Sequence, residues 1–201
     1  MISTNKNLKE KKLNCMKKIK NLFMLAAIAM ATTTATAQME KTKMVGGAAM
    51  YPSKNIVENA VNSKDHTTLV AAVKAAGLVE TLQSAGPFTV FAPTNKAFSK
   101  LPKGTVETLL KAENLKTLQT VLTYHVIAGK LSAADIIAKI KAGGGTAKVT
   151  TVAGAPLILS LKGKKVQIMD TSGGKSYVTI ADVNQSNGVI HVVNAVLVPK
   201  S

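Results

Sequence analysis

Three histidines, one cysteine and ten scattered carboxylates are the residues of this 201-residue chain that could ligate a metal or carry out acid–base and nucleophilic chemistry. None of His66, His125 and His191 has a metal-ligating partner two to four residues further along the chain. The carboxylates are not paired, and no Gly-x-Ser-x-Gly elbow, Walker loop or dinucleotide fingerprint occurs. The sequence therefore predicts no metal site, no cofactor and no enzymatic activity.

The charge of the chain comes from lysine alone: it has 26 Lys, no Arg and 10 acids, for a net charge of +16. Arginine binds phosphate and guanine through two parallel hydrogen bonds, whereas lysine acts as a mobile point charge. Without arginine, and with 3% aromatic residues, the chain is a poor candidate for specific nucleic-acid recognition. The positive charge favours anionic surfaces through a salt-sensitive attraction. The alternative interpretation is that it serves solubility alone.

An export signal is predicted near the amino terminus. The basic stretch from Met16 is followed by an apolar run over residues 22–31 and by the small-residue sequence Ala-Thr-Ala at 35–37, which predicts cleavage before Gln38. Ten apolar residues are too few to cross a bilayer, which needs about 20, so no transmembrane anchor is expected. A short buried helix is the alternative. Cleavage would remove Cys15 and leave the exported form, periplasmic or extracellular, without a thiol. Translation could begin at Met1 or at Met16.

The chain divides into an upstream segment with the signal peptide (1–37), a flexible lead-in without periodicity (38–54) and a domain (55–199). The first half of the domain has apolar residues at helical spacing, interrupted by one expected strand, Phe88–Ala92, with Thr94 as the N-cap of a following helix. Ser63–Asp65 and Ser132 are expected to cap two further helices. The second half predicts five strands separated by glycine-containing turns: Lys148–Val152, Pro156–Leu161, Lys165–Met169, Tyr177–Ala181 and Val189–Val198. Helices first and antiparallel strands later predict an α+β fold.

Three stretches of the sequence carry a resemblance to a known family. They are GPFTVFAPTNKAF at 86–98, LTYHVIAGKL at 122–131 and NGVIHVVNAVLVP at 187–199. Together, and in this order, they resemble the fasciclin-like domain, and the resemblance covers roughly residues 55–199. It implies a β-wedge of two sheets packed with several short helices. It also implies a secreted, non-enzymatic role in adhesion or surface association, with a cell-surface protein or glycan as partner.

The same resemblance suggests two candidate binding segments. Tyr124-His125 matches the Tyr-His motif that is linked to integrin contact in animal matrix members; the alternative is that both side chains plug an edge of the core. Some of those members carry Glu-Pro-Asp-Ile-Met before the Asn187-Gly188 turn. In that segment only Asp182 matches and Val183 is similar, and Asp182 could instead bond turn amides.

Lysines supply a third candidate site. Lys162, Lys164 and Lys165 flank Gly163 in a predicted hairpin turn, and with Lys148 and Lys175 they could form a basic edge. Such an edge predicts lysine-driven capture of an anionic polysaccharide or envelope component as an alternative function. Edge lysines also prevent strand-to-strand aggregation, which is the other interpretation. His191 is expected to be a partly buried, hydrogen-bonded histidine, and nothing in the sequence indicates an oligomeric state.

Overall fold

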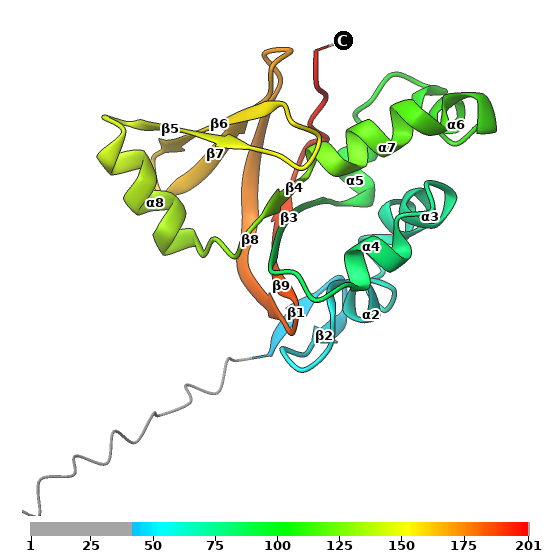
Figure 1. The fold of residues 1–201 in the computed structure, drawn as a ribbon, viewed down its shortest axis with the longest axis horizontal. Helices are drawn as coiled ribbons and strands as arrows, with labels where there is room; N and C mark the ends of the chain where they lie inside the picture. The colour runs from blue at the N-terminus through cyan, green and yellow to red at the C-terminus, as the bar shows by residue number, and fades with distance from the viewer. Residues whose placement is uncertain (1–41, 201) are drawn as a thin grey trace, which may run out of the picture. The chain divides into compact units, whose positions relative to one another are not determined.

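The computed structural model describes residues 42–200, so the predicted export signal and its cleavage point lie outside the described residues. Within this range a seven-stranded sheet runs through the domain (Figure 1). All neighbouring strands are antiparallel except β3 and β9, which are parallel. In spatial order the strands are β4 (Val126–Ala128), β3 (Phe88–Pro93), β9 (Gly188–Val193), β8 (Lys175–Gln185), β7 (Lys165–Met169), β6 (Pro156–Lys162) and β5 (Thr146–Thr150).

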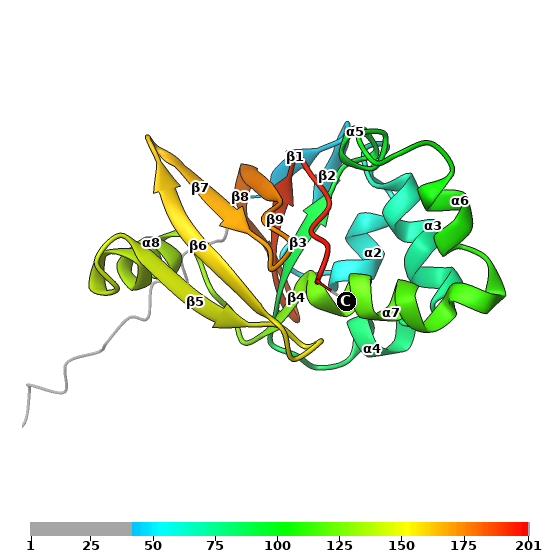
Figure 2. The same cartoon turned by 90° about the horizontal axis from the view of Figure 1, so that it is seen from above.

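Strand β8 divides the sheet into two parts. Its first residues, Lys175–Tyr177, pair with β7, whereas Val178–Gln185 pair with β9. Two register shifts, on either side of Ile180, interrupt the pairing with β9 and mark an irregular, bulged strand. The two parts, β4-β3-β9-β8 and β8-β7-β6-β5, diverge from this strand (Figure 2). This arrangement confirms the predicted α+β wedge of two sheets.

The central strands β3 and β9 are buried on both faces, as their continuous apolar sequences require. Val90 and Ile190 point into a core shared with the helices, and Phe91 and Val193 point into a second core between the two parts of the sheet. The alternation of strand side chains thus supplies both cores from the same two strands.

Helices surround the wedge on two sides (Figure 1). Helix α8 (Ala133–Ala142) packs on β5 and β6 through Ile136 and Ile140. The other helices gather beside β3, β4 and β9. They are α2 (Ile56–Ala60), α3 (Thr67–Ala75), α4 (Val79–Gln83), α5 (Asn95–Phe98), α6 (Thr105–Leu109) and α7 (Leu115–Tyr124), with the short 3₁₀ helix η1 (Ala112–Asn114) before α7.

Two of the three expected helix caps are confirmed. The Thr94 side chain accepts from the Ala97 N–H at 3.3 Å, and Ser132 forms a capping box at the start of α8. The expectation for Ser63–Asp65 is wrong, because α3 starts later, after His66. The Ser63 hydroxyl lies 2.9 Å from Nδ1 of His66 and serves that ring instead of a helix amide.

The expected flexible lead-in is also corrected where the structure describes it. Strands β1 (Lys43–Val45) and β2 (Ala48–Met50) form an antiparallel hairpin whose Val45 and Met50 side chains are buried in the core. The Lys43 ammonium donates to the Ala181 carbonyl on β8 at 2.6 Å. Strands of three residues are too short to show an alternating pattern, which is why the sequence did not predict them.

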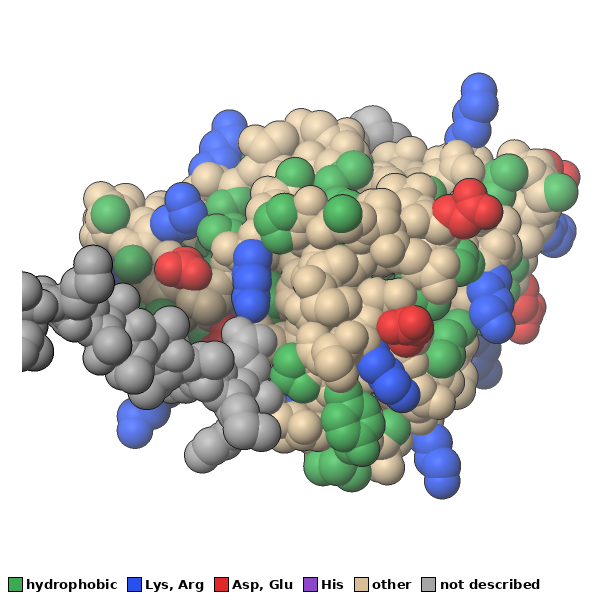
Figure 3. All heavy atoms as spheres, turned by 60° about the horizontal axis from the view of Figure 1, so that its bottom comes forward, with side chains coloured by type: hydrophobic (Ala, Val, Ile, Leu, Met, Phe, Trp, Pro, Cys, Tyr) green, Lys and Arg blue, Asp and Glu red, His purple; other side chains and the backbone are tan. Residues whose placement is uncertain are grey.

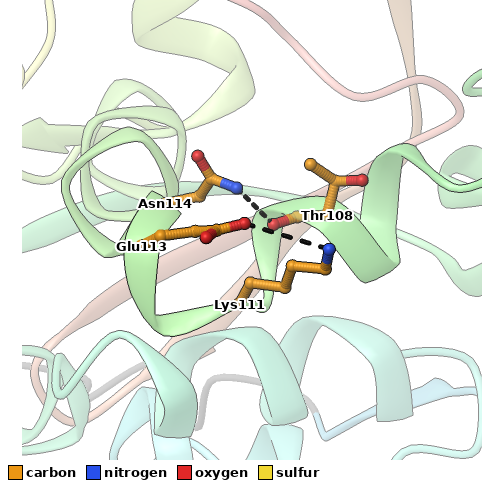
Figure 4. A network of polar contacts seen from close by, with 4 residues as sticks. All are labelled: Thr108, Lys111, Glu113 and Asn114. Atoms are coloured by element: carbon orange, nitrogen blue, oxygen red, sulfur yellow. Dashed lines mark hydrogen bonds and ion pairs between the residues drawn. The ribbon is translucent and has the colours of Figure 1, made fainter.

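One ion pair occurs between residues 42 and 200, in the link from α6 to α7 (Figure 4). Lys111 Nζ lies 3.9 Å from Glu113 Oε1, and beside it the Asn114 amide donates to the Thr108 carbonyl at 2.8 Å. Both charged side chains are exposed, so the pair contributes little to stability and offers no buried acid–base chemistry.

Candidate functional site

Tyr124 ends helix α7 with its side chain fully inside the protein, at 0% exposure. Its hydroxyl donates to the Pro156 carbonyl at 2.8 Å and accepts from the Thr171 N–H at 3.1 Å. The side chain therefore joins α7 to the start of β6 and to the loop after β7. It offers no surface to a partner unless this packing opens.

His125 follows Tyr124 and is also buried. Its Nε2 accepts the Leu197 N–H at 2.9 Å, so the proton sits on Nδ1, which donates to the Val121 carbonyl at 2.7 Å. Burial lowers the pKa of His125 to about 4, although the Val121 backbone and the Asp170 charge oppose the shift. The ring is thus neutral near pH 7 and both of its nitrogens are occupied. This geometry agrees with the interpretation that the pair plugs the core.

Asp182 lies in the bulge of β8 with a positive φ of 54°. Its Oδ1 accepts from the Ala133 N–H at 2.7 Å, which satisfies a free amide in the first turn of α8. Its own N–H donates to Nδ1 of His191 at 3.2 Å, and the opposite nitrogen of that ring donates to the Leu131 carbonyl at 2.8 Å. The amide bonded by Asp182 is therefore at the start of α8 and not in the nearby hairpin turn.

Two of the residues singled out around this bulge are buried. Val183 has no exposed surface and packs in the helix-side core. Burial lowers the pKa of His191, against the Leu131 backbone and the Asp182 charge, so this ring is neutral as well. Of the Asp182-Val183 pair, only Asp182 reaches partly to the surface.

The lysines of the third candidate site are exposed, unlike the buried or partly buried residues of the first two. The register of the strands arranges most of them on one surface. Lys162 pairs with Lys165 across the β6–β7 turn, and Lys164 lies in the turn itself. At the other end of the same strands, Lys148, Ile158, Met169 and Lys175 form one cross-strand row. Between them, Thr146, Ser160, Gln167 and Tyr177 form a second row.

We call these residues the outer sheet face. It consists of Thr146, Lys148, Ile158, Ser160, Lys162, Lys165, Gln167, Met169, Lys175 and Tyr177. Helix α8 packs against the opposite face, where the alternate side chains of the same strands are buried.

Polar groups on the outer sheet face are available for contact. Within residues 42–200, the side chains of Ser160 and Gln167 and the hydroxyl of Tyr177 form no hydrogen bond. The carboxylate nearest in sequence is Asp170, which is buried and accepts the backbone N–H groups of Ser172, Gly174 and Val198. None of the ten residues of the outer sheet face is acidic and four of them are lysines, so the face is positive.

Neither a metal centre nor a membrane span is found in the described part of the chain. No group of three or more His, Cys, Asp and Glu side chains there could hold a metal ion. Among residues 42–200 no helix has the length and hydropathy to cross a bilayer.

Comparison with known proteins gives the family. The family model of the Fasciclin domain matches residues 64–199, more than half of the chain. The chain belongs to the fasciclin domain family. Protein sll1483 of Synechocystis is 46% identical to it over 170 residues, which is 83% of this chain and 87% of that protein. The immunogenic protein MPB70 of Mycobacterium bovis is 36% identical over 145 residues, covering 70% of this chain and 66% of its own.

The chain is also similar to part of an animal protein and to a solved pair of fasciclin domains. The transforming growth factor-beta-induced protein ig-h3 of Sus scrofa is 40% identical over 131 residues, 65% of this chain and 17% of that protein. The structure of a FAS1 domain pair from the insect cell adhesion molecule Fasciclin I superposes with a TM-score of 0.64 at 18% identity. That similarity covers 72% of this chain and 50% of the other, and it shows a shared fold.

Figure 3 shows the side of the domain that lies at the bottom of Figure 1. On this side the lysines stand apart and several lie beside an acidic side chain, unlike the lysines of the outer sheet face. The sequence predicted the four lysines of the outer sheet face but not Ser160, Gln167 and Tyr177. The alternation of side chains in β6, in β7 and at the start of β8 was the available signal for these positions. The row that places Lys148 and Lys175 on one surface depends on the pairing of four strands, which alternation does not define.

Proposed function

We propose that the exported form of this fasciclin domain is a non-catalytic surface-association module that binds an anionic glycan through the outer sheet face. The observation that carries the proposal is the exposed, acid-free surface on which Lys148, Lys162, Lys165 and Lys175 surround uncommitted polar side chains. The predicted signal peptide supports export, and the similarity to adhesion proteins supports a role in surface association.

The spacing of the lysines suits an extended polyanion. Neighbouring strands lie about 4.8 Å apart, so three steps separate Lys148 from Lys175 by about 14 Å. Along β6, the row of Ile158 lies about 13 Å from Lys162, at roughly 3.3 Å per residue. A chain with regularly placed carboxylates or sulfates can meet several of these ammonium groups together.

The side chains at the centre of the outer sheet face are of the types that contact sugar rings. The half-buried Tyr177 ring presents an apolar surface with a polar tip, and Ser160 and Gln167 beside it can donate and accept hydrogen bonds. Because the charges are lysines, they attract anions without the fixed bidentate geometry of arginine. Binding should therefore depend on charge density more than on one sugar sequence, and it should weaken with salt.

The test is binding of the secreted form to a carboxylated polysaccharide and to its neutral, carboxyl-reduced counterpart. One variant replaces Lys148, Lys162, Lys165 and Lys175 by Gln; a matched control replaces Lys96, Lys103, Lys116 and Lys139, so both lose the same charge. We expect the first variant to lose at least about tenfold in affinity and the control to retain most of it, because local contacts exceed screened long-range attraction. Equal losses, or equal binding to both polysaccharides, would refute the assignment.

A protein partner is the second candidate, and exposed apolar side chains favour it. Met44 on β1 is 63% exposed and Tyr51 just after β2 is 45% exposed. A shape-specific contact there would change little between about 50 and 200 mM salt, since screening acts on charge. Retention of cell-surface binding in the four-lysine variant, with loss on Met44→Ser and Tyr51→Ser, would select this candidate.

A further inference from the structure

A cavity of about 70 Å³ lies between helices α2, α3 and α4 and the strands β3 and β9. About 10–15 Å³ of such space holds one water molecule, so the cavity is several times larger. Its walls offer water almost no hydrogen-bonding partners, and an apolar cavity of this kind tends to stay dry or take an apolar guest. Representative wall residues are Ile56, Leu69, Val73, Leu82, Val90 and Ile190.

The cavity is partly open, and its exposed edge combines apolar surface with one positive charge. Val152, in the β5–β6 loop, lines it and is 47% exposed. Lys74, near the end of α3, lines it as well and is exposed. No carboxylate between residues 42 and 200 forms an ion pair with Lys74. Glu80 on the adjacent α4 is not part of the lining.

Both histidines that line the cavity are neutral, so Lys74 is the one charged residue of the lining. His125 is neutral with both nitrogens bonded, as described above. His66 is buried, and burial lowers its pKa against the Ala92 backbone and the Asp65 charge. Its Nε2 completes no hydrogen bond, the one such buried side-chain atom in the described part of the chain. The cavity thus has an apolar interior and a cationic entrance.

We propose that this cavity binds the alkyl chain of a single-chain anionic amphiphile, with the anionic headgroup at Lys74. Charge complementarity selects an anion over a cation at the entrance, and the apolar wall selects an alkyl chain over a sugar. The site involves none of the residues of the outer sheet face, so it does not depend on glycan binding.

The experiment is calorimetric titration of the secreted protein with hexanoate, octanoate and decanoate below their micelle concentrations. Each added methylene should tighten binding roughly fourfold until the cavity is filled. Saturating decanoate should raise the thermal midpoint, because the ligand binds only the folded chain. Decyltrimethylammonium, of matched chain and opposite charge, should bind more weakly.

Two pairs of variants locate the site. Val79→Trp places a large ring at the half-buried wall of the cavity and should weaken decanoate binding at least tenfold. Val61→Trp, at the exposed C-cap of α2 and outside the lining, should not. Lys74→Gln should weaken decanoate roughly two- to fivefold and leave decanol unchanged, while Lys116→Gln changes neither. Circular dichroism confirms that each variant is folded. Affinity that is independent of chain length, or unchanged by Val79→Trp in a folded variant, would overturn the proposal, as would equal weakening of decanol by Lys74→Gln.

Discussion

Nε2 of His125 accepts the backbone N–H of Leu197 at 2.9 Å, so the residue after helix α7 holds the carboxy-terminal segment against the core. The bond requires an unprotonated Nε2, and burial lowers the pKa of the ring to about 4. An unfolded histidine has a pKa near 6.5, so between about pH 6.5 and 4 the unfolded chain binds the extra proton. Stability should be complete above this window and fall as the pH drops through it, by about 3 kcal/mol from this group.

Burial lowers the pKa of His66 and His191 too, so all three rings make the domain less stable as the pH falls. Denaturant unfolding at several pH values would measure the total, and carboxylates would add to it in the acid range. Ring proton resonances separate the contributions. A native His125 resonance that titrates near pH 6.5 would show that the bond to Leu197 does not hold the ring neutral.

Tyr124→Phe is expected to destabilise the domain by about 1–2 kcal/mol. The change removes only the hydroxyl and leaves the Pro156 carbonyl and the Thr171 N–H without their partner. Tyr177→Phe is the matched control, since its hydroxyl makes no hydrogen bond in the described structure and its loss should change stability by less than about 0.5 kcal/mol. Urea denaturation measures both. Loss of partner binding in Tyr124→Phe at unchanged stability would favour a contact role instead.

Asn187→Ala should lower the free energy of unfolding by about 3 kcal/mol, although the sequence alone predicts only a turn residue at this position. Its side chain is buried, accepts from the Ile56 N–H at 3.0 Å, and donates to the carbonyls of Leu82 and Ser84 at 2.8 and 2.9 Å. Removing the side chain leaves these three backbone groups without a hydrogen-bond partner, and each loss costs about 1 kcal/mol or more of stability. Asn62→Ala, which removes one exposed bond to Glu58, is the control. Equal unfolding midpoints for the two variants would contradict this role.

Asn187 also shows what the sequence could reveal and what it could not. The Asn-Gly pair correctly predicted the turn into β9, and glycine-bounded apolar runs predicted β7 at its observed bounds. These are local signals, because turn chemistry and alternation act over a few residues. The hydrogen bonds that join the Asn187 side chain to the Ile56 N–H and to the Leu82 carbonyl each span more than 100 residues of sequence, and no local pattern specifies them.

The candidate sites divide in the same way. The Tyr-His motif was visible in the sequence, but its burial depends on the loop after β7 and on Leu197, which only the folded chain brings together. The basic turn around Gly163 was predicted from adjacent residues. Its extension to Lys148 and Lys175 required the register of four strands.

Asp182 permits a test that separates a structural role from binding. Asp182→Asn keeps an acceptor oxygen for the Ala133 N–H and a residue type that tolerates the positive φ of 54°, so it should cost less than about 1 kcal/mol. Asp182→Ala removes the acceptor and adds backbone strain, and should cost about 2 kcal/mol. Denaturation and cell-surface binding would be measured on both. If the carboxylate only anchors α8, binding follows stability in the two variants; loss of binding in the well-folded Asn variant would show that its charge meets the partner.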